Sequence, residues 1–524
     1  MSRLKKSGGM LVKEVEGYAK HLVKGSAIVF TALALSALFG FLLRMFLARS
    51  LSVADFGLFY AVFTFVSFFA LFRDLGLNSA LVKYIPEFSV RKEFDTIKSS
   101  ITIAVLFQAI FSFSVATILF IFSGQVALAF FKTEAATLPL QIMSVWFFLI
   151  GFHWLIRSIF QGFQNMPAYA SMEFFWILSV LLMTILLVRV FGQGVTGAAS
   201  AYLVTTLVVI VFALAYFRKR YPQVFRVRAS ITKPLAKKLF AFALPILIGG
   251  LGGMILGYMD TLMITAFRTL PEVGYYQAAR PTSGILEYLA GALTIVFFPM
   301  VSELWARRER RLLNSMLHFL IKFSLLATIP AAFVFIAFPN IIIRLIFGSG
   351  YLAGSTALQI LGGGAVFTIF FVILASAIQG IGKPIVTLKV VGIMACLNFV
   401  GNSLLIPPFG IEGAAVATVI SSILGLALLF YHARKLIGFT LPASFLLKTI
   451  VGGLFTLAII FGLKSALALP AWPEAFVVMA LSLLFYVVWI LMTKTITKDE
   501  LRLVARIVPI PKWLVKVAER FIRE

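Results

Sequence analysis

The sequence has almost no cysteine and little negative charge. Cys396 is the single thiol among 524 residues, and 20 Asp and Glu stand against 46 Lys and Arg. One cysteine excludes an internal disulfide framework and a thiolate metal site, so cysteine usage says nothing about the redox compartment. The formal net charge of +26 is therefore the first property of the chain that needs a physical explanation.

Long hydrophilic stretches and a nucleotide-binding loop are also missing. The largest polar connection covers about residues 218–238, which is too short for a soluble domain. No glycine-rich loop of the form GxxxxGK followed by Ser or Thr is found, and this argues against nucleotide hydrolysis by the chain. Both absences direct attention to the apolar part of the sequence.

Apolar residues make up most of the chain. Hydrophobic residues account for 61%, aromatic residues for 15% and charged residues for 13%. Apolar runs recur from end to end, and about 20 such residues span about 30 Å of hydrocarbon as a helix. Membrane barrel strands would be about 10 residues long with alternating polarity, a pattern that does not fit these runs. The composition predicts an all-α polytopic membrane protein.

The apolar runs predict fourteen transmembrane helices in two lobes of six, followed by two more. We expect an N-lobe at 26–217, a basic cytoplasmic linker at 218–238, a C-lobe at 239–431 and the last two helices at 446–494. The basic amphipathic segments 1–25 and 495–524 are expected to lie on the inner membrane surface. The predicted spans are 26–48, 56–73, 99–122, 140–160, 168–190, 195–217, 239–267, 274–298, 313–338, 357–379, 384–406, 411–431, 446–467 and 474–494.

The positive charge gathers in the short connections. With the N-terminus inside, 37 of the 46 Lys and Arg fall on the inner side, six on the outer side and three within spans. This asymmetry predicts a multi-pass protein of the cytoplasmic membrane with both termini in the cytoplasm. It also explains the net charge by attraction to anionic membrane lipids rather than to nucleic acid. We expect a monomer.

Four short motifs occur twice, with nearly the same separation each time. Asp-Phe-Gly at 55–57 returns as Glu-Val-Gly at 272–274. Leu-Gln-Ile at 140–142 returns at 358–360, Gln-Gly at 161–162 returns at 379–380, and the Gly-rich motif at 194–199 returns at 410–415. The sequence therefore predicts that six spans were duplicated. An even number of spans preserves orientation, so the halves should be related by an axis along the membrane normal.

The same region carries a family resemblance. The segment 43–59, which contains Arg44, Arg49 and the Asp-Phe-Gly motif, is followed by Asp-Leu-Gly-Leu-Asn at 74–78. Together they resemble the start of polysaccharide and oligosaccharide-lipid flippases, within the multidrug/oligosaccharidyl-lipid/polysaccharide exporter superfamily. Supporting motifs lie at 258–264, 271–279 and 346–348, so the resemblance covers nearly the whole chain. It implies two six-helix lobes, alternating access, and a polyprenyl-diphosphate-linked glycan as cargo, carried from the inner to the outer leaflet.

Four cations lie at or inside predicted spans: Arg44, Arg73, Arg280 and Lys322. A cation at a span centre costs about 2.5–3.5 kcal/mol, so these residues are expected to have a function. Given the resemblance, we expect them to line a central cavity and bind a diphosphate, since the Arg fork bonds phosphate oxygens in pairs. The alternative is snorkelling to the interface, or pairing with Asp74 or Glu287.

A second candidate set recurs every four residues along one helix face. His153, Arg157 and Gln161 share that face and could bind sugar hydroxyls. The alternative is that Arg157 marks the inner helix end and His153 bonds a neighbouring helix. The same spacing of Gly249, Gly253 and Gly257 predicts a close helix-packing face.

A candidate cation site involves Asp260, the most isolated acid inside a predicted span. Lipid II flippases, which this chain resembles in plan, use an aspartate, an asparagine and a threonine for sodium, and the matching residues are Asp260, Asn398 and Thr418. The alternative is an ion pair between Asp260 and Arg280. Coupling to Na⁺ or H⁺ is left open, and no other cofactor is expected. Asp55 is a candidate gate residue or, equally, an ordinary helix cap.

Two other functions fit a membrane protein of this kind. A multidrug exporter of the same superfamily should have an acidic, aromatic cavity and needs only twelve spans, whereas the candidate cavity here is basic. A membrane glycosyltransferase or ligase should carry an acidic metal-binding pair in an outer loop or a sizeable soluble region, and neither is found. Transport is therefore the favoured function, without enzymatic activity.

Overall fold

A computed structural model describes residues 30–441, 443–466, 471–498 and 500–502, and every regular element in them is helical. Twelve of these helices are long and apolar enough to cross a membrane. The predicted surface segment 1–25, and the part of 495–524 that follows residue 502, lie outside the described residues. The all-helical membrane architecture is confirmed.

Two very long helices account for the difference between twelve and fourteen. Helix α16, Pro384–Ile437, has 54 residues, which at about 1.5 Å per residue is far longer than a bilayer is thick. Pro407 and Pro408 precede Gly410, whose φ of 58° and ψ of −134° break the helix there, so α16 contains two consecutive spans. Helix α12, Leu270–Ala306, has 37 residues and carries the predicted span 274–298. The arrangement is consistent with fourteen spans.

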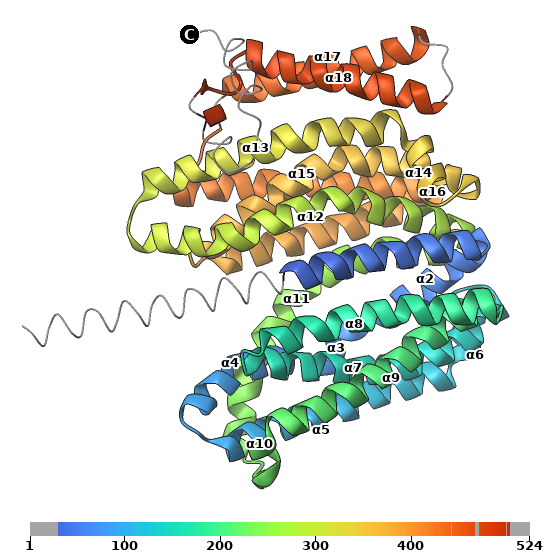
Figure 1. The fold of residues 1–524 in the computed structure, drawn as a ribbon, viewed down its shortest axis with the longest axis vertical. Helices are drawn as coiled ribbons and strands as arrows, with labels where there is room; N and C mark the ends of the chain where they lie inside the picture. The colour runs from blue at the N-terminus through green and yellow to red at the C-terminus, as the bar shows by residue number, and fades with distance from the viewer. Residues whose placement is uncertain (1–29, 442, 467–470, 499, 503–524) are drawn as a thin grey trace, which may run out of the picture. The chain divides into compact units, whose positions relative to one another are not determined.

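The chain separates into two compact units, residues 1–274 and 275–524, and the division falls within α12 (Figure 1). The first unit contains the helix Phe30–Ser50, α2 (Val53–Phe68), α3 (Ala70–Asp74), α4 (Leu77–Val90), α5 (Phe94–Ile121), α6 (Ser123–Ala129), η1 (Glu134–Ala136), α7 (Thr137–Gly162), α8 (Met166–Thr184), η2 (Ile185–Val190), α9 (Gly194–Arg220), α10 (Pro222–Arg226) and α11 (Lys233–Phe267). The second contains α13 (Arg310–Ala337), α14 (Pro339–Ile346), η3 (Ser349–Gly354), α15 (Ser355–Gly380), α16, α17 (Ala443–Ala466) and α18 (Ala471–Met492).

The two units repeat the same series of helices. Helices α7 and α15 both have 26 residues and start at Thr137 and Ser355. Helices α5 and α13 both have 28 residues and start at Phe94 and Arg310. Gly194 and Gly410, which open the last helix of each series, have φ values of 56° and 58°. The predicted internal repeat is thus visible element by element.

Helix α7 forms the centre of the first unit. It contacts α2, α4, α5, α8 and α9, and buries Ile156, Ile159 and Phe160 among their apolar side chains. Helix α11 packs on α2, α3, α4 and α5 and so belongs to this unit, although it follows the linker 218–238. The linker itself is held to α5, because Lys98 donates to the carbonyl oxygens of Phe225 and Val227 at 3.3 and 2.5 Å.

A left-handed turn between α3 and α4 allows α11 to come close. Gly76 has φ of 82°, a conformation that favours glycine. A Cβ at this position would lie 2.5 Å from the carbonyl oxygen of Ala243 in α11. The turn thus fixes the buried end of α3, where Arg73 and Asp74 are located.

The repeated motifs at 55–57 and 272–274 meet within the first unit. Ser52 caps α2 by accepting from the Asp55 amide at 3.1 Å, and its hydroxyl donates to the Asp55 carboxylate at 2.7 Å. Asp55 therefore acts in a helix cap, and a gating role stays a prediction. A methyl group on Gly57 would overlap the carbonyl oxygen of Leu270 and lie 2.9 Å from the Gly274 nitrogen. The starts of α2 and α12 are thus in direct backbone contact.

The glycine stripe of α11 does not form the predicted packing face. Among the residues that the structure describes, a Cβ at Gly249, Gly253 or Gly257 would meet no atom within 4 Å. Spacing alone predicts close helix packing, but this face of α11 lies over open space. The helix packs on its neighbours through other residues, such as Leu239 and Ala243, which are fully buried.

The contact between α2 and α12 gives a stability prediction. Gly57→Ala should force the two backbones apart and lower the free energy of unfolding by about 1–3 kcal/mol, the usual cost of overpacking. Gly249→Ala is the matched control, because the added methyl enters open space and alanine favours a helix by about 1 kcal/mol over glycine. The measurement is thermal unfolding in detergent. Equal melting temperatures for Gly57→Ala and the parent protein would contradict this account.

Candidate functional site

Helices α7 and α8 bring three ionisable side chains together inside the first unit. His153 and Arg157 lie one turn apart on α7, and Glu173 faces them from α8. The Arg157 Nη1 atom lies 3.0 Å from the Glu173 Oε2 atom, and His153 Nε2 lies 3.8 Å from the same oxygen. The side chains of His153, Arg157 and Glu173 are 0%, 5% and 17% exposed. This cluster is called the Glu173 network below.

Aromatic rings enclose the Glu173 network. The Arg157 guanidinium lies 4.3 Å from the ring centre of Tyr169 and 4.9 Å from that of Trp154. The imidazole of His153 lies 5.5 Å from the ring of Trp176. Gln161 is half-buried in the C-terminal turn of α7 and takes no part in these ion pairs. The structure thus brings His153 and Arg157 together around a carboxylate, and their binding of sugar hydroxyls stays a prediction.

Glu173 is a residue that sequence reasoning missed. It is an acid within the apolar stretch 166–190, and an acid in such a stretch needs a partner. That signal is available in the sequence, because the same argument singles out Asp260. Which cation it pairs with depends on which faces of α7 and α8 meet, and one sequence does not reveal that.

Arg73 is buried in the same unit, beside a buried amide. Its guanidinium lies 5.7 Å from the ring centre of Phe147, and its exposed fraction is 8%. Gln108 of α5 is fully buried, and neither amide atom has a hydrogen-bond partner in the described structure. Gly151 of α7 makes room for both, since a Cβ there would lie 2.8 Å from Arg73 Cδ and 2.9 Å from Gln108 Nε2.

The other predicted cations have neighbours of their own. Arg44 stacks on Tyr60 with 4.0 Å between guanidinium carbon and ring centre. Arg280 Nη1 lies 3.1 Å from Glu287 Oε1, which is the pairing alternative expected from the sequence. Both side chains of that pair are about one third exposed, at 34% and 29%. Diphosphate binding by these cations stays a prediction.

Lys322 is paired with a residue beyond the last membrane helix. Its Nζ atom lies 2.7 Å from Glu500 Oε2 and 2.8 Å from Oε1. Burial raises the pKa of the Glu500 carboxyl, but the hydrogen bonds from Lys322 and Thr497 together outweigh burial and hold that pKa below its usual value. The pair fastens the segment after α18 to α13.

The candidate sodium ligands belong to both units. Asp260 lies in α11 and is 5% exposed. In the second unit, the kink of α16 brings the other two candidate ligands together. Asn398 Nδ2 donates to Thr418 Oγ1 at 3.2 Å. Asn402, one turn further, donates to Asn398 Oδ1 at 3.1 Å. The sodium site itself stays a prediction.

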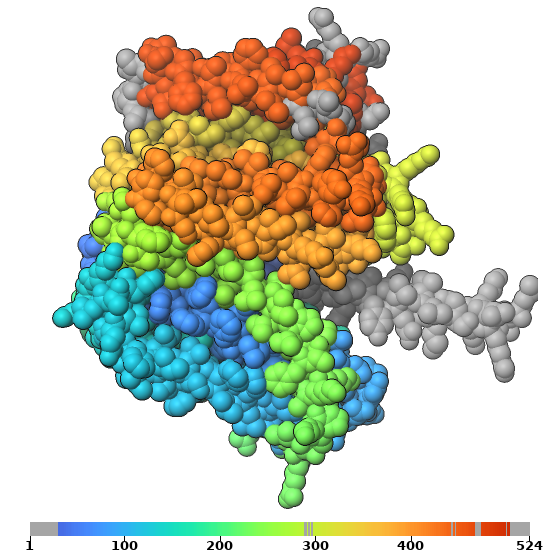
Figure 2. Space-filling view, turned by 180° about the vertical axis from the view of Figure 1, so that it is seen from behind, coloured from blue at the N-terminus to red at the C-terminus, as the bar shows by residue number. Residues whose placement is uncertain are grey.

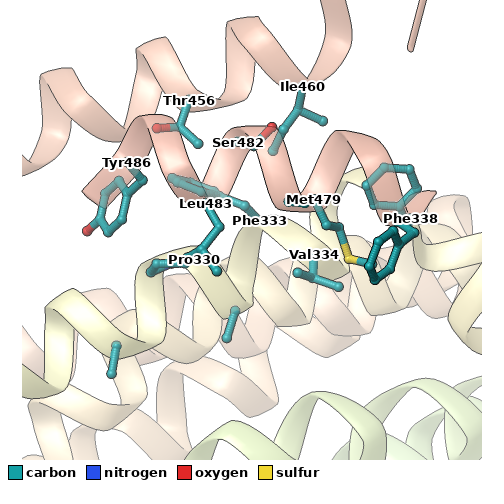
Figure 3. A pocket seen from close by; sticks show the side chains of 14 residues that line it. Pro330, Phe333, Val334, Phe338, Thr456, Ile460, Met479, Ser482, Leu483 and Tyr486 are labelled. Atoms are coloured by element: carbon teal, nitrogen blue, oxygen red, sulfur yellow. The ribbon is translucent and has the colours of Figure 1, made fainter. Parts of the chain in front are cut away.

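A long apolar groove of about 530 Å³ lies between α13, α17 and α18 (Figure 3). Phe333, Val334 and Phe338 form one wall, and Met479 and Leu483 of α18 face them (Figure 3). In the space-filling view, α17 and α18 form an orange-red layer beside the yellow α13 (Figure 2). The sequence did not predict this groove, because it arises from three helices distant in the chain.

Comparison with protein families and known proteins gives one consistent picture. A family model described as "Polysaccharide biosynthesis protein" matches residues 22–305. An uncharacterized membrane protein of Methanocaldococcus jannaschii is 30% identical over 459 residues, which cover 85% of this chain and 90% of that protein. A probable low-salt glycan biosynthesis flippase, Agl15, of Haloferax volcanii is 25% identical and covers 93% of this chain and 100% of its own length.

The fold agrees with a solved transporter structure. The lipid II flippase MurJ in an inward closed conformation superimposes with a TM-score of 0.71, covering 88% of this chain and 98% of that chain. The sequence identity is 17%, so the likeness concerns the fold. It supports the resemblance drawn from the motifs in the sequence.

Proposed function

Because the chain belongs to the polysaccharide biosynthesis protein family of multi-pass membrane proteins, we propose that it is a flippase for a lipid-diphosphate-linked oligosaccharide. The cargo would move from the inner to the outer leaflet of the cytoplasmic membrane. The flippase name of the relative Agl15, which aligns over its whole length, is the observation that carries the proposal. The residues predicted to bind the headgroup are cations, which fits transport of an anion.

The proposed headgroup ligands are Arg44 and Arg280. The Arg44 guanidinium carbon lies 4.0 Å from the ring centre of Tyr60. A planar guanidinium can bind two phosphate oxygens through the N–H groups at its edge. Arg280 already bonds one carboxylate, Glu287, and a phosphate oxygen is chemically similar to a carboxylate oxygen. Arg73 and Lys322 are weaker candidates, since one is buried beside Phe147 and the other is paired with Glu500.

The groove between α13, α17 and α18 is the proposed site of the isoprenoid tail. Its lining is apolar apart from the hydroxyls of Thr456, Ser482 and Tyr486. Lipid tails are as apolar as this lining, so van der Waals packing along the groove, and not a hydrophobic driving force, would hold a long hydrocarbon chain there. Helices α17 and α18 supply one side of it, which gives the two helices beyond the repeat a function.

The membrane potential supports outward movement of an anionic cargo. An inside-negative potential of about 100 mV favours export of one negative charge by about 2.3 kcal/mol. A sodium ion bound by Asp260 is the proposed second source of energy. A drug-cation exporter would instead need an acidic binding cavity, and the candidate ligands here are basic.

The central test is flipping of a fluorescent lipid-diphosphate-linked oligosaccharide in proteoliposomes. Arg44→Ala and Arg280→Ala should each slow flipping about 10- to 100-fold, because each loses charged hydrogen bonds of about 1.5–3 kcal/mol. Arg49→Ala, an exposed cation on the same helix as Arg44, is the control and should keep the parental rate. Parental rates in both test variants would remove the headgroup assignment.

The groove can be tested with cargo of different tail length. Ala480 lines the groove, and Ala480→Trp should fill part of it and weaken binding of a long-tail cargo several-fold. A short-tail analogue should bind as before, because it does not reach the filled part. Leu484→Trp is the control, since Leu484 is 61% exposed and not part of the lining. Equal loss for both tail lengths would contradict the groove assignment.

Sodium binding is measurable without transport. Sodium should raise the melting temperature of the detergent-solubilised protein relative to potassium, because an ion that binds only the folded state stabilises it. Asp260→Asn removes the charged ligand and should abolish this difference, while Asp55→Asn should retain it. A sodium effect of unchanged size in Asp260→Asn would exclude this site.

A further inference from the structure

The Glu173 network occurs in only one of the two repeats. When α7 and α15 are aligned from their first residues, Thr137 and Ser355, His153 and Arg157 correspond to Phe371 and Ala375. The starts of α8 at Met166 and of α16 at Pro384 are separated by the same number of positions, so Glu173 corresponds to Val391. The second repeat forms the same helices with apolar residues at all three positions, and the fold therefore does not require the charges.

The imidazole of His153 is buried without a hydrogen bond. It is 0% exposed, and neither ring nitrogen has a hydrogen-bond partner in the described structure. A buried polar group left without a partner costs about 1–3 kcal/mol. Glu173 Oε2 lies 3.8 Å from His153 Nε2 and forms an ion pair with Arg157 at 3.0 Å, but it has no hydrogen-bond partner in the described structure either. The imidazole of His153, which can accept a proton, therefore lies beside the Glu173 carboxylate without a hydrogen bond between them.

We propose that His153 and Glu173 form a proton-binding site in which Glu173 exchanges Arg157 for protonated His153. The proton comes from water and is bound by a ring nitrogen, with no covalent bond broken in the protein. An N–H···O bond needs a distance of about 2.7–3.2 Å, so α7 and α8 must approach by about 1 Å at this point. Arg157 remains stacked on Tyr169 and Trp154 after the exchange.

The route of the proton runs through Glu173. Its side chain is 17% exposed, whereas that of His153 is 0% exposed. A carboxylate that is partly exposed accepts a proton and passes it to the imidazole behind it. Proton binding does not depend on the proposed function, while its coupling to glycan transport does.

The charged residues around His153 affect whether its imidazole binds a proton. Glu173, Arg157 and Arg73 lie close enough for their charges to act on His153. Burial opposes a positive charge on His153 most strongly, two cations oppose it as well, and Glu173 alone of these groups favours it, so a proton binds only with the help of Glu173. The other titratable and charged residues on helices in contact with α7 are Asp55, Tyr60, Asp74, Lys83, Tyr84, Glu87, Asp95, Lys98, Glu134, Tyr169, Tyr202, Tyr216, Arg218, Lys219 and Arg220.

The test uses tryptophan fluorescence of the full-length protein in detergent between about pH 5 and pH 9, the range in which histidine titrates. Protonated imidazole quenches a neighbouring indole, and Trp176 lies 5.5 Å from His153. The parent protein should show a titration that disappears in His153→Gln and in the double variant Trp154→Phe, Trp176→Phe, since Trp154 also lies within 6.1 Å of His153. In Glu173→Gln the midpoint should fall by about one pH unit, a tenfold weaker proton affinity, because the imidazolium loses its carboxylate. His318→Gln, which changes a histidine of the second unit, should leave the titration unchanged.

Two outcomes would overturn the proposal. One is a titration that persists in His153→Gln, and the other is the absence of any titration in the parent protein. If His153→Gln does not fold, the triple variant His153→Phe, Arg157→Ala and Glu173→Val replaces it, since these residues occupy the equivalent positions of the second repeat. It should fold and show no titration.

A second measurement separates this proposal from the proposed function. A pH step across proteoliposomes should change the flipping rate of the parent protein several-fold but not that of His153→Gln. If no variant flips the glycan while the fluorescence titration behaves as expected, the cargo assignment fails and the proton site stands. If flipping occurs and the titration is insensitive to His153 and Glu173, the proton site fails alone.

Discussion

Hydrocarbon cannot solvate a charged side chain, and this constrains the ionisable residues inside the helical bundle. A charged side chain at membrane depth must find its partner within the protein. The described structure meets this requirement with ion pairs: Arg157 with Glu173, Arg280 with Glu287 and Lys322 with Glu500. Two of these cations, Arg280 and Lys322, are among those that the sequence marks as costly, and pairing with a carboxylate lowers that cost.

The two repeats share the same series of helices, whereas several charged and polar candidate residues occur in one repeat only. The two series of helices agree in length and in the glycines that open their last helices, at Gly194 and Gly410. Their packing comes from apolar residues on helix faces, which both repeats share. The charged network around Glu173 and the amide–hydroxyl pair of Asn398 and Thr418 each occur on one side only. Function in a duplicated fold is thus found where the copies differ.

The sequence predicted what depends on local pattern and failed where tertiary contact decides. Apolar runs gave the spans, including 384–406 and 411–431, which lie on either side of the break in α16. The spacing of His153 and Arg157 placed them on one face, yet their partner Glu173 required knowledge of how α8 turns. The glycine stripe of α11 had the spacing of a packing face and meets open space instead. The groove beside α13 needs three helices, so no window of sequence contains it.

A carrier must release what it binds, and paired cations make this possible. An arginine without a partner in a low-dielectric site would hold a phosphate too strongly, because charge interactions there are only weakly screened. Glu287 lies 3.1 Å from Arg280, so under the proposed function a phosphate would bind Arg280 by displacing this carboxylate. The net free energy of cargo binding at Arg280 is then the difference between the Arg280–phosphate and Arg280–Glu287 interactions. Under the proposed function, that difference is small enough for the cargo to leave once the helices rearrange.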